Sequence, residues 1–257
     1  MPARPDFPVN DTMKIKIINP NTTQSMTDKI GQCARAVAHG DTRIVAVSPR
    51  MGPASIESHY DEALSVPGIL DEILIGEREG IDGYVIACFG DPGLFAAREL
   101  ARGPVIGVAE AAMHAASFIG TSFSVVTTLS RTCNIAWHLA ERYGMARFCR
   151  NVRASDLPVL DLEKPGSDAR RIITEACRQA LAEDRSDCIV LGCAGMTDLC
   201  DEIADAIGAP VIDGVTCAVK MAEALVSVRL ATSKRGDWAR PLPKAYAGML
   251  SHYALNA

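Results

Sequence analysis

The sequence carries one short pattern at two places: an apolar run, a cysteine, small residues that force a turn, and then the start of a helix. In the first copy the run covers residues 84–87 and leads into Cys88, and in the second it covers residues 189–191 and leads into Cys193. An apolar run without alternation is typical of a strand buried on both faces, as in a parallel sheet. The pattern therefore predicts two thiols at the carboxyl ends of buried strands, where open α/β sheets bind ligands.

Further landmarks recur in the same order. Residues 103–107, Gly-Pro-Val-Ile-Gly, are echoed by residues 209–213, Ala-Pro-Val-Ile-Asp, and residues 14–19 are echoed by residues 122–127. Matched landmarks indicate two copies of one α/β unit. We therefore predict an α/β fold with two pseudo-symmetric lobes, each a mainly parallel sheet flanked by helices, and an active site in the cleft between them.

The predicted domain organisation follows from this repeat. Residues 13–119 form the first lobe and residues 120–214 the second, and a helix at about 215–230 returns to the first lobe. Residues 1–12 are Pro-rich and polar and are interpreted as a flexible N-terminal extension. Residues 231–257 are interpreted as a C-terminal tail. Its aromatic residues fit packing on the body or on another subunit, and packing within the chain is the preferred interpretation.

The expected elements are read from apolar periodicity and turn residues. Strands are expected at residues 14–19, 43–48, 84–87, 105–108, 122–128, 148–154, 189–191 and 211–213. Helices are expected from a cap at Thr22 or Thr23 to residue 38, at 60–79 with a possible break at Pro67, at 96–101, 110–119, 134–143, 168–183, from near Thr197, at 215–228, and a short one within 246–254.

Composition excludes several classes of protein. The chain has 257 residues, of which 48% are apolar and 22% charged, as in soluble globular proteins. A net charge of −5 without a basic stripe argues against a nucleic-acid partner. No apolar run is long enough to span a membrane, and no secretory signal is evident. Nine cysteines, an odd number, favour free thiols in a reducing cytoplasm, and the absence of a C-x-x-C pair predicts no metal site.

Two opposed thiols suggest an acid/base pair. A free thiol has a pKa of ~8.5, and we expect a helix N-terminus to lower it for Cys88 and Cys193. If one is thiolate and the other thiol, the first removes a proton from one face of a carbon and the second delivers one to the other face. No cofactor is needed when a neighbouring carbonyl holds the charge. Backbone N–H groups at residues 89–90 and 194–195 are candidate donors to that oxygen.

Four segments carry a family resemblance: Ile-Asn-Pro-Asn-Thr-Thr at 18–23, Gly-Pro-Ala-Ser-Ile-Glu at 52–57, Cys-Phe-Gly-Asp-Pro-Gly-Leu at 88–94 and Leu-Gly-Cys-Ala-Gly-Met at 191–196. Together they resemble the hydantoin racemase and allantoin racemase family, within the aspartate/glutamate racemase superfamily. The resemblance implies cofactor-independent racemisation at C5 of a small cyclic ureide, with Cys88 and Cys193 as the two bases. It also implies a homo-oligomer.

The sequence departs from the amino-acid racemases of that superfamily beside both cysteines. Those enzymes have an Asn-Thr pair after the first cysteine and a Thr-His pair after the second, whereas this chain has Phe89-Gly90 and Ala194-Gly195. Such a site suits a neutral ring better than a zwitterion. The second cysteine disfavours an arylmalonate decarboxylase. A maleate isomerase-like enzyme and a non-enzymatic two-lobed binding protein stay open as alternatives, and the sequence does not choose between allantoin and other 5-substituted hydantoins.

The candidate substrate contacts are Asn19, Ser55, Phe89, Gly90, Thr127, Ala194 and Gly195. Asn19 and Thr127 follow or end strands in equivalent places, but such residues also serve as turn residues. Ser55 lies in the long polar loop 49–58, where an exposed turn residue is the competing interpretation. Phe89 either contacts the ring or fills the core between the lobes. Asp91 is expected to cap the helix that follows it.

Overall fold

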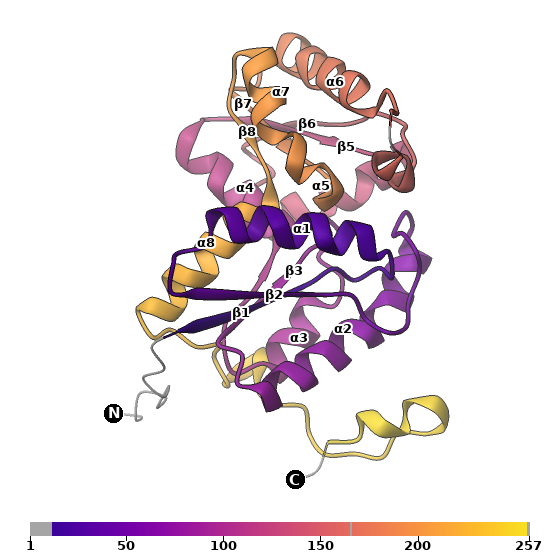
Figure 1. Cartoon of the computed structure of the whole chain (residues 1–257), viewed down its shortest axis with the longest axis vertical. Coiled ribbons are helices and arrows are strands. Elements are labelled where there is room, and N and C mark those ends of the chain that lie inside the picture. Colours follow the sequence, from indigo (N-terminus) through magenta and orange to yellow (C-terminus); the bar gives the residue numbers. More distant parts are fainter. Residues whose placement is uncertain (1–11, 165, 256–257) are drawn as a thin grey trace.

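Each half of the chain forms a four-stranded parallel sheet, and the two sheets are the centres of two lobes, one above the other in Figure 1. The structure is a computed structural model and describes residues 12–164 and 166–255. The first sheet has the order β2-β1-β3-β4 and the second the order β6-β5-β7-β8, with every neighbouring pair parallel. The predicted fold class is confirmed, and the two sheets share one strand order.

The strands are β1 (Met13–Ile18), β2 (Thr42–Val47), β3 (Gly83–Ile86), β4 (Val105–Gly107), β5 (Phe123–Thr127), β6 (Cys149–Ala154), β7 (Cys188–Leu191) and β8 (Val211–Ile212). The α-helices are α1 (Gln24–Val37), α2 (His59–Glu79), α3 (Leu94–Leu100), α4 (Val108–Ile119), α5 (Cys133–Arg142), α6 (Ala169–Asp184), α7 (Cys200–Ile207) and α8 (Gly214–Ser227). Short 3₁₀ segments are η1 (Ser130–Thr132), η2 (Val159–Glu163), η3 (Ala194–Leu199), η4 (Gly236–Trp238) and η5 (Gly248–Tyr253).

Several helix ends differ from the sequence predictions. Thr23 occupies the N-cap of α1, but its hydroxyl donates to the Ala54 carbonyl at 2.6 Å instead of capping the helix. Helix α2 continues through Pro67 without a break. The helix expected from near Thr197 begins only at Cys200, because η3 occupies the preceding residues. The short helix expected near the C-terminus is the 3₁₀ segment η5.

The last helix of each half packs on the sheet of the other half. In α8, Val219 shares a buried cluster with Ile15 of β1, in the first sheet. In α4, Met113 shares a buried cluster with Phe123 of β5, in the second sheet. The two helices thus cross between the lobes in opposite directions (Figure 1). They start close together, because a Cβ added at Gly214 would overlap the backbone of α4.

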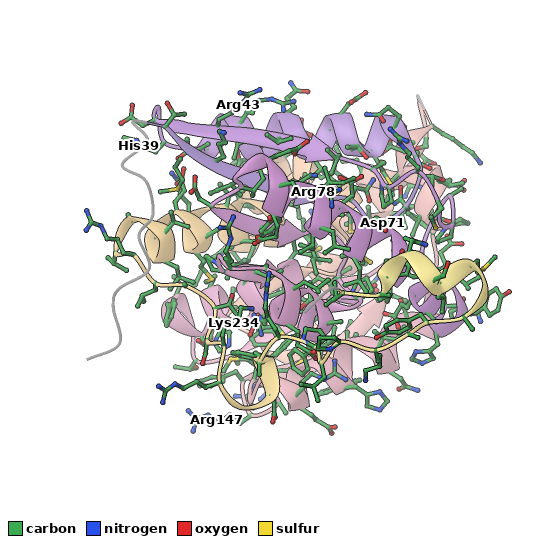
Figure 2. The ribbon with its side chains drawn as sticks, turned by 90° about the horizontal axis from the view of Figure 1, so that it is seen from below. His39, Arg43, Asp71, Arg78, Arg147 and Lys234 are labelled. Atoms are coloured by element: carbon green, nitrogen blue, oxygen red, sulfur yellow. The ribbon has the colours of Figure 1, made fainter. Side chains whose placement is uncertain are left out.

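The tail packs on the first lobe. The Trp238 ring lies 6.2 Å from the Phe95 ring and 5.0 Å from the Arg98 guanidinium. Figure 2 shows this face from below, with the yellow tail passing from Lys234 toward the part of α2 that carries Asp71. These contacts agree with the interpretation that the tail packs within its own chain.

The predicted flexible extension at residues 1–12 lies outside the described residues except for Thr12. Within the described ranges, no helix is both long enough and apolar enough to cross a membrane.

Candidate active site

The two repeated cysteines line the same pocket between the lobes. Cys88 lies two residues beyond β3 and Cys193 two residues beyond β7, so both stand at carboxyl ends of parallel strands. Asn19, just after β1, and Thr127, at the end of β5, line the pocket as well. The cavity is small, about 60 Å³. The convergence of both strand-end thiols on one crevice is therefore a feature of the structure.

A tight turn holds Cys88 at the pocket wall. Its carbonyl accepts a hydrogen bond from the Asp91 N–H at 2.9 Å. Gly93, with φ of 65°, then lets the chain enter α3 through the left-handed region that favours glycine. The thiol is partly exposed, and the nearby Gly90 N–H favours its thiolate form.

Cys193 is held by a different turn. It has extended backbone and precedes η3, and its carbonyl accepts from the Met196 N–H at 3.1 Å. The Gly195 N–H favours the thiolate form of Cys193, as the Gly90 N–H does for Cys88.

Burial raises the pKa of both thiols, contrary to the sequence expectation. The pKa of Cys193 rises to about 11, and that of Cys88 rises as well. In both cases desolvation is the largest cause and outweighs the stabilising N–H groups of Gly90 and Gly195. The expected helix dipole is weak here, since α3 starts only at Leu94 and η3 is a short 3₁₀ segment. A negative charge on Cys193 would raise the pKa of Cys88 further, so the two sulfurs interact electrostatically.

Six of the seven candidate substrate contacts line this pocket: Asn19, Phe89, Gly90, Thr127, Ala194 and Gly195. Ser55 does not, although Ile56 and Ser58 from the same loop do. The long loop 49–58 therefore contributes to the wall, but through residues other than the predicted serine.

Asn19 presents an acceptor to the pocket. Both hydrogens of its amide are used, because Nδ2 donates to Asn21 Oδ1 at 3.0 Å and to Thr27 Oγ1 at 2.9 Å. Its Oδ1 has no hydrogen-bond partner in the part of the chain that the structure describes. On the opposite lobe, the Thr127 hydroxyl donates to the Gly192 carbonyl at 3.1 Å. The amide of Asn19 is thus fixed by its neighbours with only its oxygen free.

Glu62 is a pocket residue that the sequence analysis missed. It lies in the first turn of α2, and its side chain is 19% exposed. A Cβ added at Gly90 would overlap its Oε1, so the carboxylate lies directly against the Cys88 turn. Burial raises the pKa of Glu62, opposed by His59, whose Nδ1 lies 3.3 Å from Oε2. The only sequence signal was its position just after the long loop, but acidic residues in a first helical turn usually just stabilise the helix.

Asp91 caps a different helix from the one predicted. Its carboxylate accepts from the N–H groups of Ala109 and Glu110, at 3.1 and 3.0 Å, at the start of α4 and not of α3. It also accepts from the Tyr143 hydroxyl at 2.7 Å, which links it to the second half of the chain. Burial raises the pKa of Asp91 to about 7, and these three hydrogen bonds oppose the rise. Asp91 therefore joins the Cys88 turn to α4 and α5.

Two polar links close the pocket between the lobes. Lys29 of α1 forms an ion pair with Glu163 of η2, with Nζ 2.9 Å from Oε1. Glu57 of the long loop accepts from the Val159 N–H at 2.7 Å, and Val159 itself lines the pocket. Among the described residues, no group of three or more His, Cys, Asp or Glu side chains could hold a metal ion.

Comparison with known proteins confirms the resemblance inferred from the motifs. The sequence model of the family described as Asp/Glu/Hydantoin racemase matches residues 15–222. The chain is 54% identical over 236 residues to a hydantoin racemase of Rhizobium meliloti, covering 92% of this chain and 98% of that protein. It is 47% identical over 244 residues to a hydantoin racemase of Pseudomonas sp. (strain NS671), covering 95% and 98%.

Solved structures agree. The allantoin racemase from Klebsiella pneumoniae superimposes with a TM-score of 0.92 at 53% identity, covering 93% of this chain and 98% of that chain. Sequence, fold and the paired thiols lead to one conclusion: the chain belongs to the Asp/Glu/Hydantoin racemase family and is an isomerase of the racemase class.

Proposed function

We propose that this racemase inverts C5 of allantoin or another 5-substituted hydantoin by a two-base mechanism, with Cys88 and Cys193 on opposite faces of the ring. The observation that carries the proposal is that both thiols line one pocket from equivalent strand ends of two lobes. The hydantoin and allantoin racemases similar to this chain supply the substrate class.

The proton balance of the reaction is simple. One cysteine, as thiolate, takes the proton from C5, and the electron pair of the C–H bond moves into the adjacent carbonyl to give an enolate. The other cysteine, as thiol, gives its proton to the opposite face of C5. After one turnover the roles of the two sulfurs are exchanged, so no redox step or added reactant is needed.

Backbone donors are available for the enolate oxygen. The N–H groups of Phe89 and Ala194 donate to no backbone carbonyl in the described residues, while those of Gly90 and Gly195 lower the pKa of the two thiols. We therefore assign the oxyanion role to Phe89 and Ala194, and a thiolate-stabilising role to the two glycines.

The raised thiol pKa values suit a carbon acid as substrate. A thiolate with a pKa of about 11 is a stronger base than an ordinary one, which favours proton removal from carbon. The same shift leaves only one molecule in ~10⁴ in the thiolate form at pH 7, four pH units below that pKa. Donors to the ring carbonyl would lower the free energy of the enolate and so reduce the barrier to proton removal.

The test uses solvent exchange and two matched substitutions. In D₂O, the wild type should place deuterium at C5 of both enantiomers of allantoin or 5-methylhydantoin while optical rotation decays. Cys88→Ser and Cys193→Ser should each lower racemisation by roughly 10²–10⁴-fold, the usual contribution of a general acid or base. Cys33→Ser is the control, because Cys33 lies in α1 and does not line the pocket. Full racemisation by both active-site variants would reject the two-base mechanism.

The same experiment separates the alternatives. A two-lobed binding protein would show no deuterium incorporation and would retain ligand binding in both serine variants. A maleate isomerase-like enzyme would act on an open-chain double bond and would leave C5 of the ureide unchanged.

We further propose that the protein is a cytoplasmic homo-oligomer. All nine cysteines are free, which is compatible with a reducing compartment. The tail exposes large apolar side chains, including Leu242 and Met249, that a second copy would cover. Sedimentation velocity tests the assembly, and a monomer at all concentrations would contradict it.

A further inference from the structure

Glu62 places an unpaired carboxylate oxygen in the pocket wall. Its Oε2 lies 3.3 Å from Nδ1 of His59, a side chain that is 74% exposed. Its Oε1 faces the Gly90 backbone and has no hydrogen-bond partner in the part of the chain described. Arg142, in α5, is the other cation that influences this carboxylate, and it forms no ion pair with it. Glu62 therefore keeps an acceptor available toward the pocket.

Two other polar side chains of the pocket are engaged with protein groups. The Ser58 hydroxyl donates to Asp61 Oδ2 at 2.7 Å and accepts from the Asp61 N–H. The Thr127 hydroxyl donates to the Gly192 carbonyl, as described above. Glu62 Oε1 and Asn19 Oδ1 are therefore two side-chain acceptors of the pocket without a protein donor in the described residues. Glu62 lies in the first turn of α2, and Asn19 lies just after β1.

A carboxylate at this position disfavours the negatively charged groups of the proposed reaction unless the ligand donates a hydrogen bond to it. Its negative charge disfavours a thiolate on the neighbouring Cys88. It would disfavour a negatively charged enolate in the same way if it touched the ring. An N–H donor on the ligand removes most of this penalty, because hydrogen bonds to a buried carboxylate are among the stronger ones.

We propose that Glu62 is a specificity-determining residue that accepts a hydrogen bond from an N–H group on the 5-substituent of the ureide. Every 5-substituted hydantoin carries the same ring N–H groups at N1 and N3, so an acceptor distinguishes between these substrates only through donors on the 5-substituent. Glu62 thereby favours a ureido substituent, as in allantoin, over a substituent without N–H groups. This inference rests on the proposed racemisation of 5-substituted hydantoins.

The experiment compares two substrates in three proteins. Wild type, Glu62→Gln and the control Glu141→Gln are assayed by polarimetry with enantiopure allantoin and with 5-methylhydantoin. Glu141 is an exposed glutamate on α5 that lines no part of the pocket. Glu62→Gln should lower kcat/KM for allantoin about tenfold or more, because a charge-assisted hydrogen bond is weakened. It should leave 5-methylhydantoin unchanged or faster, since the charge beside Cys88 is removed.

A binding measurement makes the two proposals separable. Allantoin should protect Cys88 from iodoacetamide in the wild type, and Glu62→Gln should need about tenfold more allantoin for the same protection. An active wild type whose allantoin preference and protection are unchanged in Glu62→Gln overturns the role of Glu62 alone. A wild type that racemises neither ureide overturns the proposed function, and the inference with it.

Discussion

The two cysteine turns are connected to the helices beyond them by different residues. In the first half, Asp91 in the turn itself accepts from the N–H groups that begin α4. In the second half, Asp213 at the end of the last strand caps α8, accepting from the Val215 N–H at 2.8 Å and from the Thr216 N–H at 3.0 Å. Thr197, in the η3 segment that follows Cys193, donates its hydroxyl hydrogen to Asp213 Oδ1 and so connects the cysteine turn to this cap. Both lobes have the same link between turn and helix, built from different side chains.

The difference between the two links is explained by one position of the repeat. Asp213 corresponds to Gly107, since Gly107 is the N-cap residue of α4 and Asp213 is the N-cap residue of α8. A Cβ added at Gly107 would overlap the carboxyl group of Asp91. The glycine clears the space that Asp91 occupies, and Asp213 fills the equivalent space directly. The link between turn and helix is therefore repeated as a contact, although the residues that make it differ between the two halves.

The two thiols also lie in different electrostatic surroundings. Glu62 and Asp91 raise the pKa of Cys88, whereas Lys29 lowers that of Cys193 against the opposing effect of Glu57 and Glu163. The net shifts are upward for both thiols, and the Lys29 cation acts on Cys193. We expect the two thiols to titrate at different pH values.

The largest expected effect is the pH dependence of alkylation. Only the thiolate reacts, and its fraction rises tenfold per pH unit below the pKa, so labelling of Cys193 by iodoacetamide should rise about 10³-fold from pH 7 to pH 10. It should level off near its pKa of about 11, and Cys88 should be the slower of the two throughout. Peptide mapping by mass spectrometry measures both rates. The urea-unfolded chain is the control, with thiols that level off near pH ~8.5. A plateau below pH 9 for either folded thiol would contradict the burial that raises their pKa.

Removing each helix-capping carboxylate should produce the next largest effect. Asp91→Ala leaves three donors unpaired, those of Ala109, Glu110 and Tyr143, and should lower the free energy of unfolding by ~3 kcal/mol or more. Asp213→Ala should have a similar effect if the two links are equivalent. Urea unfolding measures both, and a loss under ~1 kcal/mol for only one variant would show that the links are unequal.

Gly107→Ala tests why the two links differ. The added methyl group overlaps Asp91, so it should lower the free energy of unfolding by about 1–3 kcal/mol. In an Asp91→Ala background the same change should have a much smaller effect, because the carboxyl group is gone. The double variant Asp91→Ala/Gly107→Asp should recover part of the lost stability by copying the second half. An equal effect of Gly107→Ala in both backgrounds would reject the steric explanation.

Tyr143→Phe should have the smallest effect of the series. It removes one hydroxyl donor from Asp91 and should lower the free energy of unfolding by ~1–2 kcal/mol, since the lost bond is to a buried carboxylate. Tyr253→Phe is the matched control, because that hydroxyl donates to the Pro67 carbonyl at 2.7 Å on the surface of the first lobe. A loss for Tyr253→Phe as large as that for Tyr143→Phe would argue against a special role of Asp91.

Sequence patterns predicted the parallel strands and the paired thiols because these depend on local features. An apolar run such as β3 or β7 reveals burial on both faces, and the small residues after each cysteine reveal the turn. The repeat then placed both thiols at equivalent strand ends. These patterns are local in the sequence, so they can be recognised without knowledge of the tertiary structure.

The features that were missed depend on contacts between distant residues. Asp91 was expected to cap the next helix, but its partners begin 18 residues later, and only the close approach allowed by Gly107 makes that contact possible. Glu62 reaches the pocket because α2 docks against the Cys88 turn, which no periodicity in α2 indicates. The upward pKa shift of Cys88 and Cys193 arises from burial in the folded chain, whereas the turn sequences alone suggested a downward shift.

Because α4 and α8 cross between the lobes, each half of the chain supplies a helix that covers the sheet of the other half, as in a domain swap within one molecule. A fragment ending after α4 would lack the helix that covers its own sheet and would carry a helix suited to a sheet it does not have. Two identical fragments could satisfy each other by exchanging that helix, so a half-length chain is expected to be stable only as a symmetric pair.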